Sequence, residues 1–224
     1  MLGVQTAEPV AVLTFDDGPE PNSTEVVLAE LGAAGATATF FVLVRRARRH
    51  RRLLAEIIAS GHDVALHGAD HRRLTSLDPG NSTKLLHDAR AELEQLAGVQ
   101  VRMFRPPYGS QSPAVWHAVV AAGLVPVLWE VECREWDPMP DTDPLADFDN
   151  LRRGSIVLGH DAIASVEDGA ESLVVSPIDR RAITTAILAR IQAAGLRAIS
   201  LSRALERGRP RWRVWLDKAN APST

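Results

Sequence analysis

The strongest constraint on the fold of this chain is a regular alternation of short apolar runs with segments of helical spacing. The apolar, β-branched runs predict strands at 10–15, 36–44, 63–66, 101–104, 125–131, 155–158 and 196–201. Helix-start signals or helical spacing fill most of the intervening segments. Such alternation is typical of parallel βαβ units, and continuous apolar strands are typical of a sheet covered on both faces. The sequence therefore predicts an α/β fold, a closed or nearly closed (β/α) barrel, with an open doubly wound sheet as the alternative.

Two cap-plus-proline pairs predict helix starts in the second half of the chain. Ser112-Pro113 and Ser176-Pro177 each place a residue that favours the N-cap before a first-turn proline. The second helix is expected to run to about Ala194 and to end at the glycine that follows.

Length and charge limit the class of protein. The 224 residues, undivided by a linker or repeat, predict one main domain at 8–206 and an extension at 207–224 that packs Trp212 and Trp215. The formal charge of −3 does not favour a general affinity for nucleic acid or acidic membranes. No apolar run approaches the roughly 18 residues of a membrane helix. The first nine residues do not resemble a signal peptide, so a cytoplasmic location is the simplest expectation, although a processed or truncated secreted protein would look the same. The oligomeric state is left open.

One basic run departs from this balance. Six of the eight residues at 45–52 are arginine. We interpret the run as a solvated loop and helix start, because a single basic run in a net-acidic chain is weak evidence for an anionic partner.

Ionisable side chains gather at the ends of the predicted strands. They follow five of the strands and are Asp16, Asp17, His67, His71, Arg105, Glu130, Glu132, Glu135, His160 and Asp161. In a (β/α) barrel the carboxyl ends of the strands converge on one face, where the functional loops lie. The sequence therefore predicts that these residues share one site.

Two histidines and an aspartate pair have the chemistry of a metal site. His67 and His71 are four residues apart, so in a helical turn they face the same way and can share a metal. The adjacent carboxylates of Asp16 and Asp17 repel each other unless a cation or a proton compensates. One of them is expected as the third ligand and the other as a free base, which leaves positions open for water and substrate. The alternatives are solvated or core histidines and a plain Asp-Gly-Pro turn.

The remaining strand-end residues fit hydrolysis. A metal lowers the pKa of bound water from 15.7 toward roughly 7, and a nearby carboxylate can take the proton as the water attacks a carbonyl. His160 is placed to protonate the leaving group, and Arg105 to orient the free carboxylate. The single cysteine, Cys133, is not expected as a nucleophile, and no Gly-x-Ser-x-Gly sequence is present.

Five motifs occur in a fixed order along the chain. They are TFDDGP at 14–19, HGADH at 67–71, RPPY at 105–108, ECREW at 132–136 and LGH at 158–160. Together they resemble the motifs of the polysaccharide deacetylases with a NodB-type domain, carbohydrate esterase family 4. The resemblance covers about residues 10–201. It implies a distorted (β/α)7 barrel with the catalytic domain at 8–206, and a metal-dependent hydrolase that removes N-acetyl groups from an amino-sugar polymer or oligosaccharide.

The resemblance also implies catalytic and ligand roles. Asp16 would be the base, oriented by Arg105, and His160 would be the general acid, tuned by Glu135. One divalent ion, Zn²⁺ first with Co²⁺, Fe²⁺ or Ni²⁺ as alternatives, would be held by Asp17, His67 and His71.

Four further residues would form the pocket. The backbone N–H of Tyr108 would help to hold the oxyanion. The walls around the acetylated carbohydrate would come from Pro107, Trp136 and Leu158.

The motifs depart from the family pattern in places. Gly68 stands where Ser or Thr is usual, and Glu132 and Glu135 stand where Asp is usual. A carboxylate displaced by one methylene can disturb catalytic geometry, which is sensitive to shifts on the order of 1 Å. An O-acetyl esterase, a small-molecule amide hydrolase, or a decayed carbohydrate-binding protein are therefore kept as alternatives. The segment 162–176 is expected to be either a substrate lid or a solvated loop.

Overall fold

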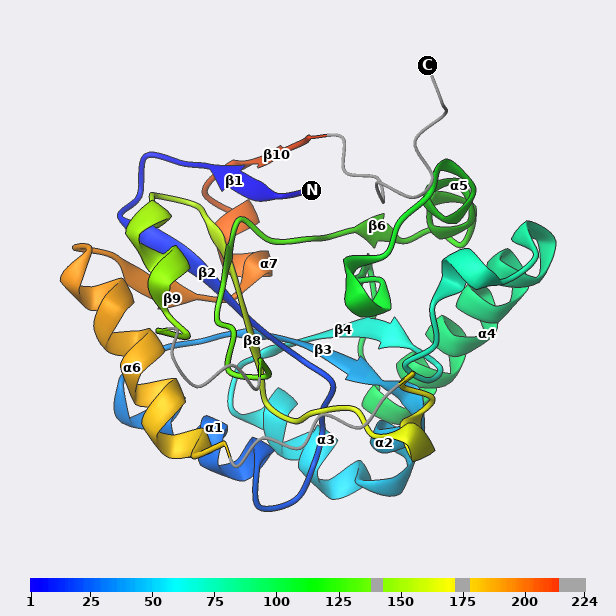
Figure 1. The fold of residues 1–224 in the computed structure, drawn as a ribbon, viewed down its shortest axis with the longest axis horizontal. Helices are drawn as coiled ribbons and strands as arrows, with labels where there is room; N and C mark the ends of the chain where they lie inside the picture. The colour runs from blue at the N-terminus through cyan, green and yellow to red at the C-terminus, as the bar shows by residue number, and fades with distance from the viewer. Residues whose placement is uncertain (138–142, 172–177, 214–224) are drawn as a thin grey trace.

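The computed structural model describes residues 1–137, 143–171 and 178–213 (Figure 1). Its main sheet consists of β2 (Val10–Asp16), β3 (Thr39–Leu43), β4 (Asp63–Gly68), β5 (Met103–Phe104), β6 (Val125–Pro126), β7 (Val131–Glu132), β8 (Ile156–His160) and β9 (Arg197–Ile199). The helices are α1 (Thr24–Ala33), α2 (Val44–Arg49), α3 (Arg51–Ala59), α4 (Pro79–Ala97), α5 (Pro113–Ala121), α6 (Arg180–Ala193) and α7 (Leu201–Leu205). All pairings within this sheet are parallel.

The sheet is curled rather than open. Its strand order is β6-β5-β4-β3-β2-β8-β7, while β9 pairs with the start of β2. Seven strands laid flat at about 4.8 Å spacing would hold the two edges about 29 Å apart. Yet the edge strands β6 and β7 are joined by four residues, 127–130, whose peptide steps reach at most about 18 Å. The edges must therefore curl toward each other, which confirms the distorted barrel and excludes the open doubly wound sheet.

The same short connection corrects one strand prediction. The apolar run 125–131 does not form one strand: it is β6 at one edge of the sheet, an irregular crossing, and β7 at the other edge. Along the crossing, the N–H of Val127 donates to the carbonyl of Phe104 and the N–H of Glu130 to that of Ile156. Periodicity missed the break because every residue of the run except Glu130 is apolar and the backbone bonds of the run go to distant segments.

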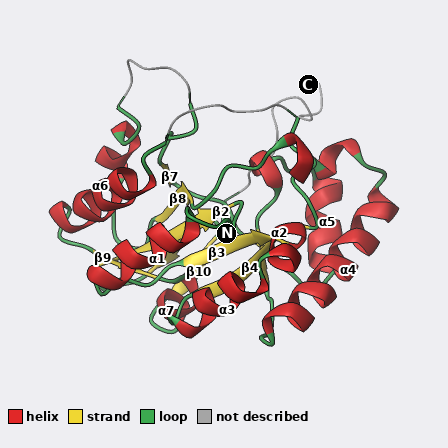
Figure 2. Ribbon diagram, turned by 90° about the horizontal axis from the view of Figure 1, so that it is seen from below, coloured by secondary structure: helices red, strands yellow, loops and turns green. Residues whose placement is uncertain are grey.

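Helices pack around the strands, as Figure 2 shows. In α3, Leu53, Leu54 and Ile57 are buried while the arginines of its first turn are exposed, the pattern of an amphipathic helix. The apolar side chains of the strands, such as Phe15 and Phe40, join the same core. Within the described residues, no helix has both the length and the apolar character needed to cross a membrane.

The predicted helix boundaries are largely confirmed. Ser112 caps α5, since its side chain accepts a hydrogen bond from the N–H of Val115. The expected start at Ser176-Pro177 lies outside the described residues. The helix described there begins at Arg180, capped by the side chain of Asp179, and ends near Ala194 as expected.

The two ends of the described chain meet in a small second sheet. β1 (Gly3–Gln5) pairs antiparallel with β10 (Arg209–Arg211), so both strands lie outside the predicted limits 8–206. An ion pair between Arg211 and Glu130 ties β10 to the crossing segment of the barrel. The expectation that Trp212 packs is wrong, because its side chain is 57% exposed, and Trp215 lies outside the described residues.

Candidate metal centre and active site

Three potential metal ligands converge at the carboxyl ends of β2 and β4. Asp17 directly follows β2, His67 lies at the end of β4, and His71 lies in the turn that follows. Asp17 Oδ1 is 3.3 Å from Nε2 of each imidazole, and the three possible ligand atoms all lie within 4.8 Å of one another. The structure thus brings together the three residues that the family resemblance implies as ligands.

The hydrogen bonds of this group fit a metal ion. Nδ1 of His67 is 2.9 Å from the carbonyl oxygen of Arg105. A carbonyl only accepts, so Nδ1 carries the proton and the Nε2 lone pair faces Asp17. Oδ2 of Asp17 accepts a hydrogen bond from the N–H of Ala164, whereas the buried Oδ1 has no hydrogen-bond donor among the described residues. Burial raises the pKa of Asp17, but the imidazoles of His71 and His67 outweigh it and hold the pKa well below its usual value. A bare carboxylate oxygen that faces the ring nitrogens of two imidazoles is the donor set of a divalent cation.

Asp16 lies beside the ligands but is held by a different partner. Its Oδ1 accepts a 2.6 Å hydrogen bond from Nη1 of the fully buried Arg105, and its Oδ2 lies 3.8 Å from Nε2 of His67. The same Nη1 donates to the hydroxyl of Thr14, and the guanidinium stacks 4.1 Å above the ring of Phe41. Burial lowers the pKa of Arg105, and Asp16 opposes this. Arg105 therefore fixes the orientation of the Asp16 carboxylate, and Oδ2 of Asp16 faces the ligand group.

His160 stands across from Asp16 in the register of β2 and β8. Oε1 of Glu135 accepts from the backbone N–H of His160 at 2.7 Å and lies 3.2 Å from its Nδ1. Burial lowers the pKa of His160, but the carboxylate of Glu135 outweighs it and raises the pKa to about 9. Arg180, at the start of α6, donates to the carbonyl of His160 at 2.5 Å and lies 3.5 Å from Oε1 of Glu135. Sequence reasoning missed Arg180, because it follows none of the predicted strands.

A cavity of about 400 Å³ opens over these groups. Asp16, Asp17, both ligand histidines and His160 all line it. Its walls are largely aromatic and aliphatic and include Tyr108, Trp129, Trp136, Leu158 and Ala170.

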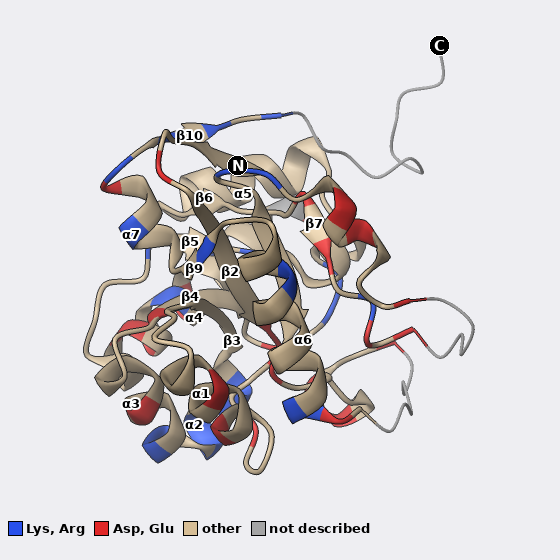
Figure 3. Ribbon diagram, turned by 90° about the vertical axis from the view of Figure 1, so that its left-hand side faces the viewer, with Lys and Arg blue, Asp and Glu red and all other residues tan. Residues whose placement is uncertain are grey.

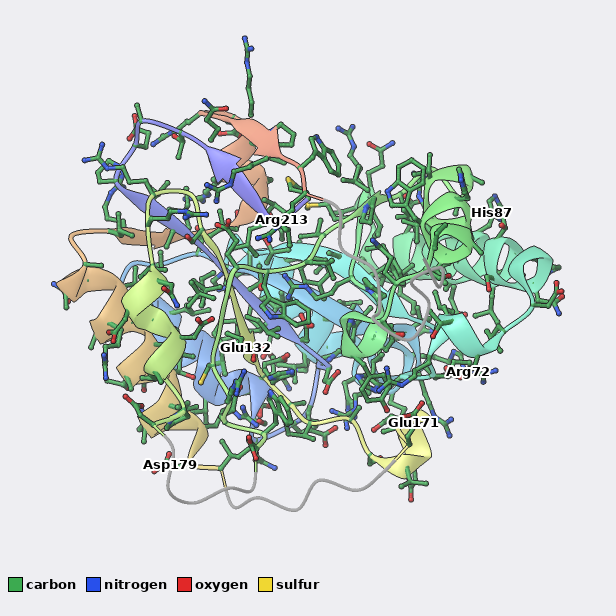
Figure 4. All side chains as sticks on the ribbon, turned by 45° about the horizontal axis from the view of Figure 1, so that its top comes forward. Arg72, His87, Glu132, Glu171, Asp179 and Arg213 are labelled. Carbon is green, nitrogen blue, oxygen red and sulfur yellow. The ribbon has the colours of Figure 1, made fainter. Side chains whose placement is uncertain are left out.

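Three details set the shape of these walls. Tyr108 has a φ of 61°, which turns its backbone in the loop after β5. Glu132 accepts a 2.9 Å hydrogen bond from the indole of Trp129. Figure 4 shows the labelled Glu132 over the middle of the ribbon. Pro107 was predicted to line the pocket, but it is buried in the turn that carries Tyr108 and does not line the cavity.

Gly68 departs from the family pattern for a backbone reason. Its φ is +124°, a region that side chains rarely adopt, and a Cβ there would lie 2.7 Å from the carbonyl oxygen of Asp70. The loop between the ligand histidines therefore has a conformation that requires glycine.

Two basic side chains outside the cavity are buried in structural contacts. His62 accepts a hydrogen bond from the N–H of Ala38 and packs against Phe40. The prediction that the basic run is solvated is wrong for Arg46, because its side chain is buried and pairs with Asp168. Figure 3 shows several basic residues on α2.

Asp161 had been assigned no role. Its carboxylate accepts from the N–H of Gly18 at 3.1 Å and from the hydroxyl of Thr24, which ties β8 to the loop that carries Asp17. Burial raises the pKa of Asp161 to about 6. A Cβ on Gly18 would collide with this carboxylate, so glycine is needed there for close approach.

Comparisons with known proteins agree with this geometry. A family model described as polysaccharide deacetylase matches residues 3–127. The chain is 36% identical over 152 residues to a chitooligosaccharide deacetylase of Azorhizobium caulinodans, covering 66% of this chain and 72% of the relative. It is 30% identical over 162 residues to a peptidoglycan-N-acetylglucosamine deacetylase of Bacillus cereus, covering 70% and 75%.

A solved structure is similar in fold. It is a family 4 carbohydrate esterase from Streptomyces lividans in complex with acetate, with a TM-score of 0.73 at 24% identity, covering 95% of this chain and all of that one. The family model spans more than half of the chain, and both curated relatives are covered over more than two thirds of their length. The chain therefore belongs to the polysaccharide deacetylase family.

Proposed function

We propose that this protein is a metal-dependent hydrolase that removes N-acetyl groups from amino-sugar polymers or oligosaccharides. The observation that carries the proposal is the content of one cavity: a three-residue ligand group, a separately held carboxylate at Asp16 and an imidazole at His160. The names of the two curated relatives, one acting on chitooligosaccharides and the other on peptidoglycan, support an N-acetylated amino sugar as the substrate class.

Asp17, His67 and His71 would hold the ion. A divalent cation bound there supplies Lewis-acid polarisation and activation of water. We assign Zn²⁺ first, because two histidines and one carboxylate with open positions are a common catalytic zinc set, although Co²⁺, Fe²⁺ and Ni²⁺ accept the same donors.

The chain's own residues account for the proton transfers. Asp16, kept in place by Arg105, takes a proton from the attacking water. The backbone N–H of Tyr108 donates to the oxygen that gains charge at the acetyl carbonyl. His160, kept protonated by Glu135, gives its proton to the amide nitrogen as the carbon–nitrogen bond breaks. The products are acetate and a free amine.

The cavity walls fit an acetylated sugar. Leu158 is buried at the wall and Trp136 is partly exposed there, so an apolar contact is available to an acetyl methyl and an aromatic face to a sugar ring.

The test is acetate release from N-acetylated chito-oligosaccharides. We expect acetate and free amine in equal amounts, loss of activity after chelation and dialysis, and recovery with Zn²⁺ or Co²⁺. Peptidoglycan fragments and acetylated xylan run in parallel separate the amide substrates from an O-acetyl ester. Activity that survives full metal removal, or acetate released from the ester alone, contradicts the proposal.

A further inference from the structure

One segment outside the strand ends touches two of the three ligand residues. The segment 162–171 follows β8 and contains the 3-10 turn η4 (Val166–Asp168). The N–H of Ala164 donates to Oδ2 of Asp17 at 2.8 Å. The backbone N–H of His71 donates to the carbonyl of Asp168 at 2.7 Å. The segment therefore fixes both a ligand carboxylate and the backbone of a ligand imidazole.

A buried ion pair holds this segment in place. Oδ2 of Asp168 lies 2.6 Å from Nη2 of Arg46, and both side chains are almost fully buried. The same nitrogen donates to the carbonyl of Ile163 at 2.9 Å. Oδ2 of Asp168 also accepts from the N–H and the hydroxyl of Ser165, at 3.0 and 2.8 Å. Arg46 thus contacts the segment on both sides of Ala164, at Ile163 and at Asp168. In Figure 1 the yellow trace of the segment passes beside α2.

The first turn of α2 also holds the loop between the two histidines. The N–H of Arg45 donates to the carbonyl of Ala69 at 3.1 Å. Gly68 has no side chain that could help to fix this loop, so this contact from α2 contributes to the position of the loop. Neighbouring residues of α2 therefore hold both loops that carry or contact the ligands, Arg45 through its backbone and Arg46 through its guanidinium.

The engagement of Asp17 Oδ2 has a consequence for metal binding. With Oδ2 occupied by the N–H of Ala164, only Oδ1 faces the two imidazoles. If the segment shifts, the carboxylate is free to rotate and the backbone of His71 loses its acceptor. Groups that orient ligands in this way affect metal affinity strongly, with losses of roughly 10–100-fold on mutation.

We propose that Arg46 and Asp168 are positioning residues which, through the segment 162–171, set the affinity of the Asp17, His67 and His71 group for a divalent cation. The inference rests on the metal site of the proposed function. It concerns two residues that are not among the three ligands and do not line the cavity.

The test compares metal affinity in matched variants. Metal-free wild type, Asp168→Asn and Arg46→Gln are titrated with Zn²⁺ by calorimetry and with Co²⁺ by its visible absorption. Arg48→Gln is the control, because Arg48 lies on the same helix and pairs with Glu92, but with side chains that are 57% and 35% exposed. We expect Kd to rise about 10–100-fold in both Arg46 and Asp168 variants and to stay within about twofold in the control. The double variant should lose little more than either single variant, because the two residues act as a unit.

Thermal unfolding of the metal-free proteins separates positioning from plain stability. A purely structural pair would lower Tm and leave Kd unchanged in the folded protein. If Asp168→Asn does not fold, Arg46→Lys decides: it keeps the charge but cannot bridge Asp168 and Ile163 in the same way, so its Kd should also rise. If the folded variants bind metal with the wild-type Kd, or if Arg48→Gln loses as much metal affinity as they do, the inference is overturned. The proposed function is not affected by either result. A wild type that binds neither metal refutes the inference and the proposed function together.

Discussion

The charge of Glu135 is expected to set the alkaline limit of activity. Glu135 is buried, and its Oε1 is bonded to the backbone N–H of His160 and adjacent to its ring Nδ1. His160 must be protonated to act as the acid, so activity falls as the pH rises through its pKa. Replacing Glu135 with Gln keeps the size of the side chain but removes the negative charge, so the pKa of His160 should fall.

The expected shift follows from the structure. Burial lowers the pKa of His160, and Glu135 with nearby carboxylates raises it to about 9, against an ordinary value of 6.5. Without Glu135, the pKa should return to about 6.5 or below, a loss of about 3 kcal/mol of preference for the charged ring. At pH 8 about nine tenths of the rings are protonated with a pKa of 9, but only about 3% with a pKa of 6.5. A bound cation opposes the imidazolium in both proteins, so the difference between them is the quantity to measure.

The assay is kcat against pH from 5.5 to 10 for wild type and Glu135→Gln, with metal saturated. We expect the alkaline limb of Glu135→Gln to lie about 2.5 pH units below that of wild type, which without the cation's effect corresponds to a decrease of about 30-fold at pH 8. Glu130→Gln is the control, since Glu130 is also paired with arginines but does not line the cavity. An alkaline limb at the same pH in wild type and Glu135→Gln refutes the reasoning.

Three further variants test separate parts of the site. Asp16→Asn should lower kcat by about 10²–10⁴-fold and leave the bound metal unchanged by elemental analysis, because the base is lost but the ligands remain; loss of metal as well would place Asp16 among the ligands. His71→Ala should lose the metal, and an unchanged metal content would contradict its assignment as a ligand. Gly68→Ala should lower the free energy of unfolding by about 1–3 kcal/mol in denaturant titration, because of its φ of +124° and the nearby carbonyl of Asp70. Gly32→Ala, where a Cβ meets nothing within 4 Å, should not destabilise, and equal stability of both variants would contradict the strain argument.

The main part of the site could be predicted because it depends on strand order and strand ends. Apolar runs locate the strands, and parallel strands in a barrel bring their carboxyl ends to one face. Asp17, His67 and His160 therefore meet in one cavity although they are far apart in the sequence. Helix caps also depend on local sequence, so the start of α5 at Ser112 could be predicted as well.

What the sequence did not show depends on long-range partners. Arg46 looked like one member of a solvated basic run, and its burial depends on Asp168, 122 residues away. Arg180 contacts Glu135 from the start of α6, whereas the sequence-based prediction covered ionisable residues at strand ends. Gly68 stands where Ser or Thr is usual in the family pattern, but the backbone dihedral angle shows that this loop needs glycine. Local patterns report which residues are buried or capped, whereas the two arginines require a distant segment to be in place and Gly68 requires the dihedral angle of its own loop.

The most direct test of the account is an anomalous diffraction map at the zinc edge from crystals of the metal-loaded protein. The account predicts a single peak at about 2.0–2.2 Å from Oδ1 of Asp17 and Nε2 of both His67 and His71, with Asp16 and His160 unligated. A peak bonded to Asp16 in place of Asp17, or no peak between the two imidazoles at saturating Zn²⁺, would contradict it.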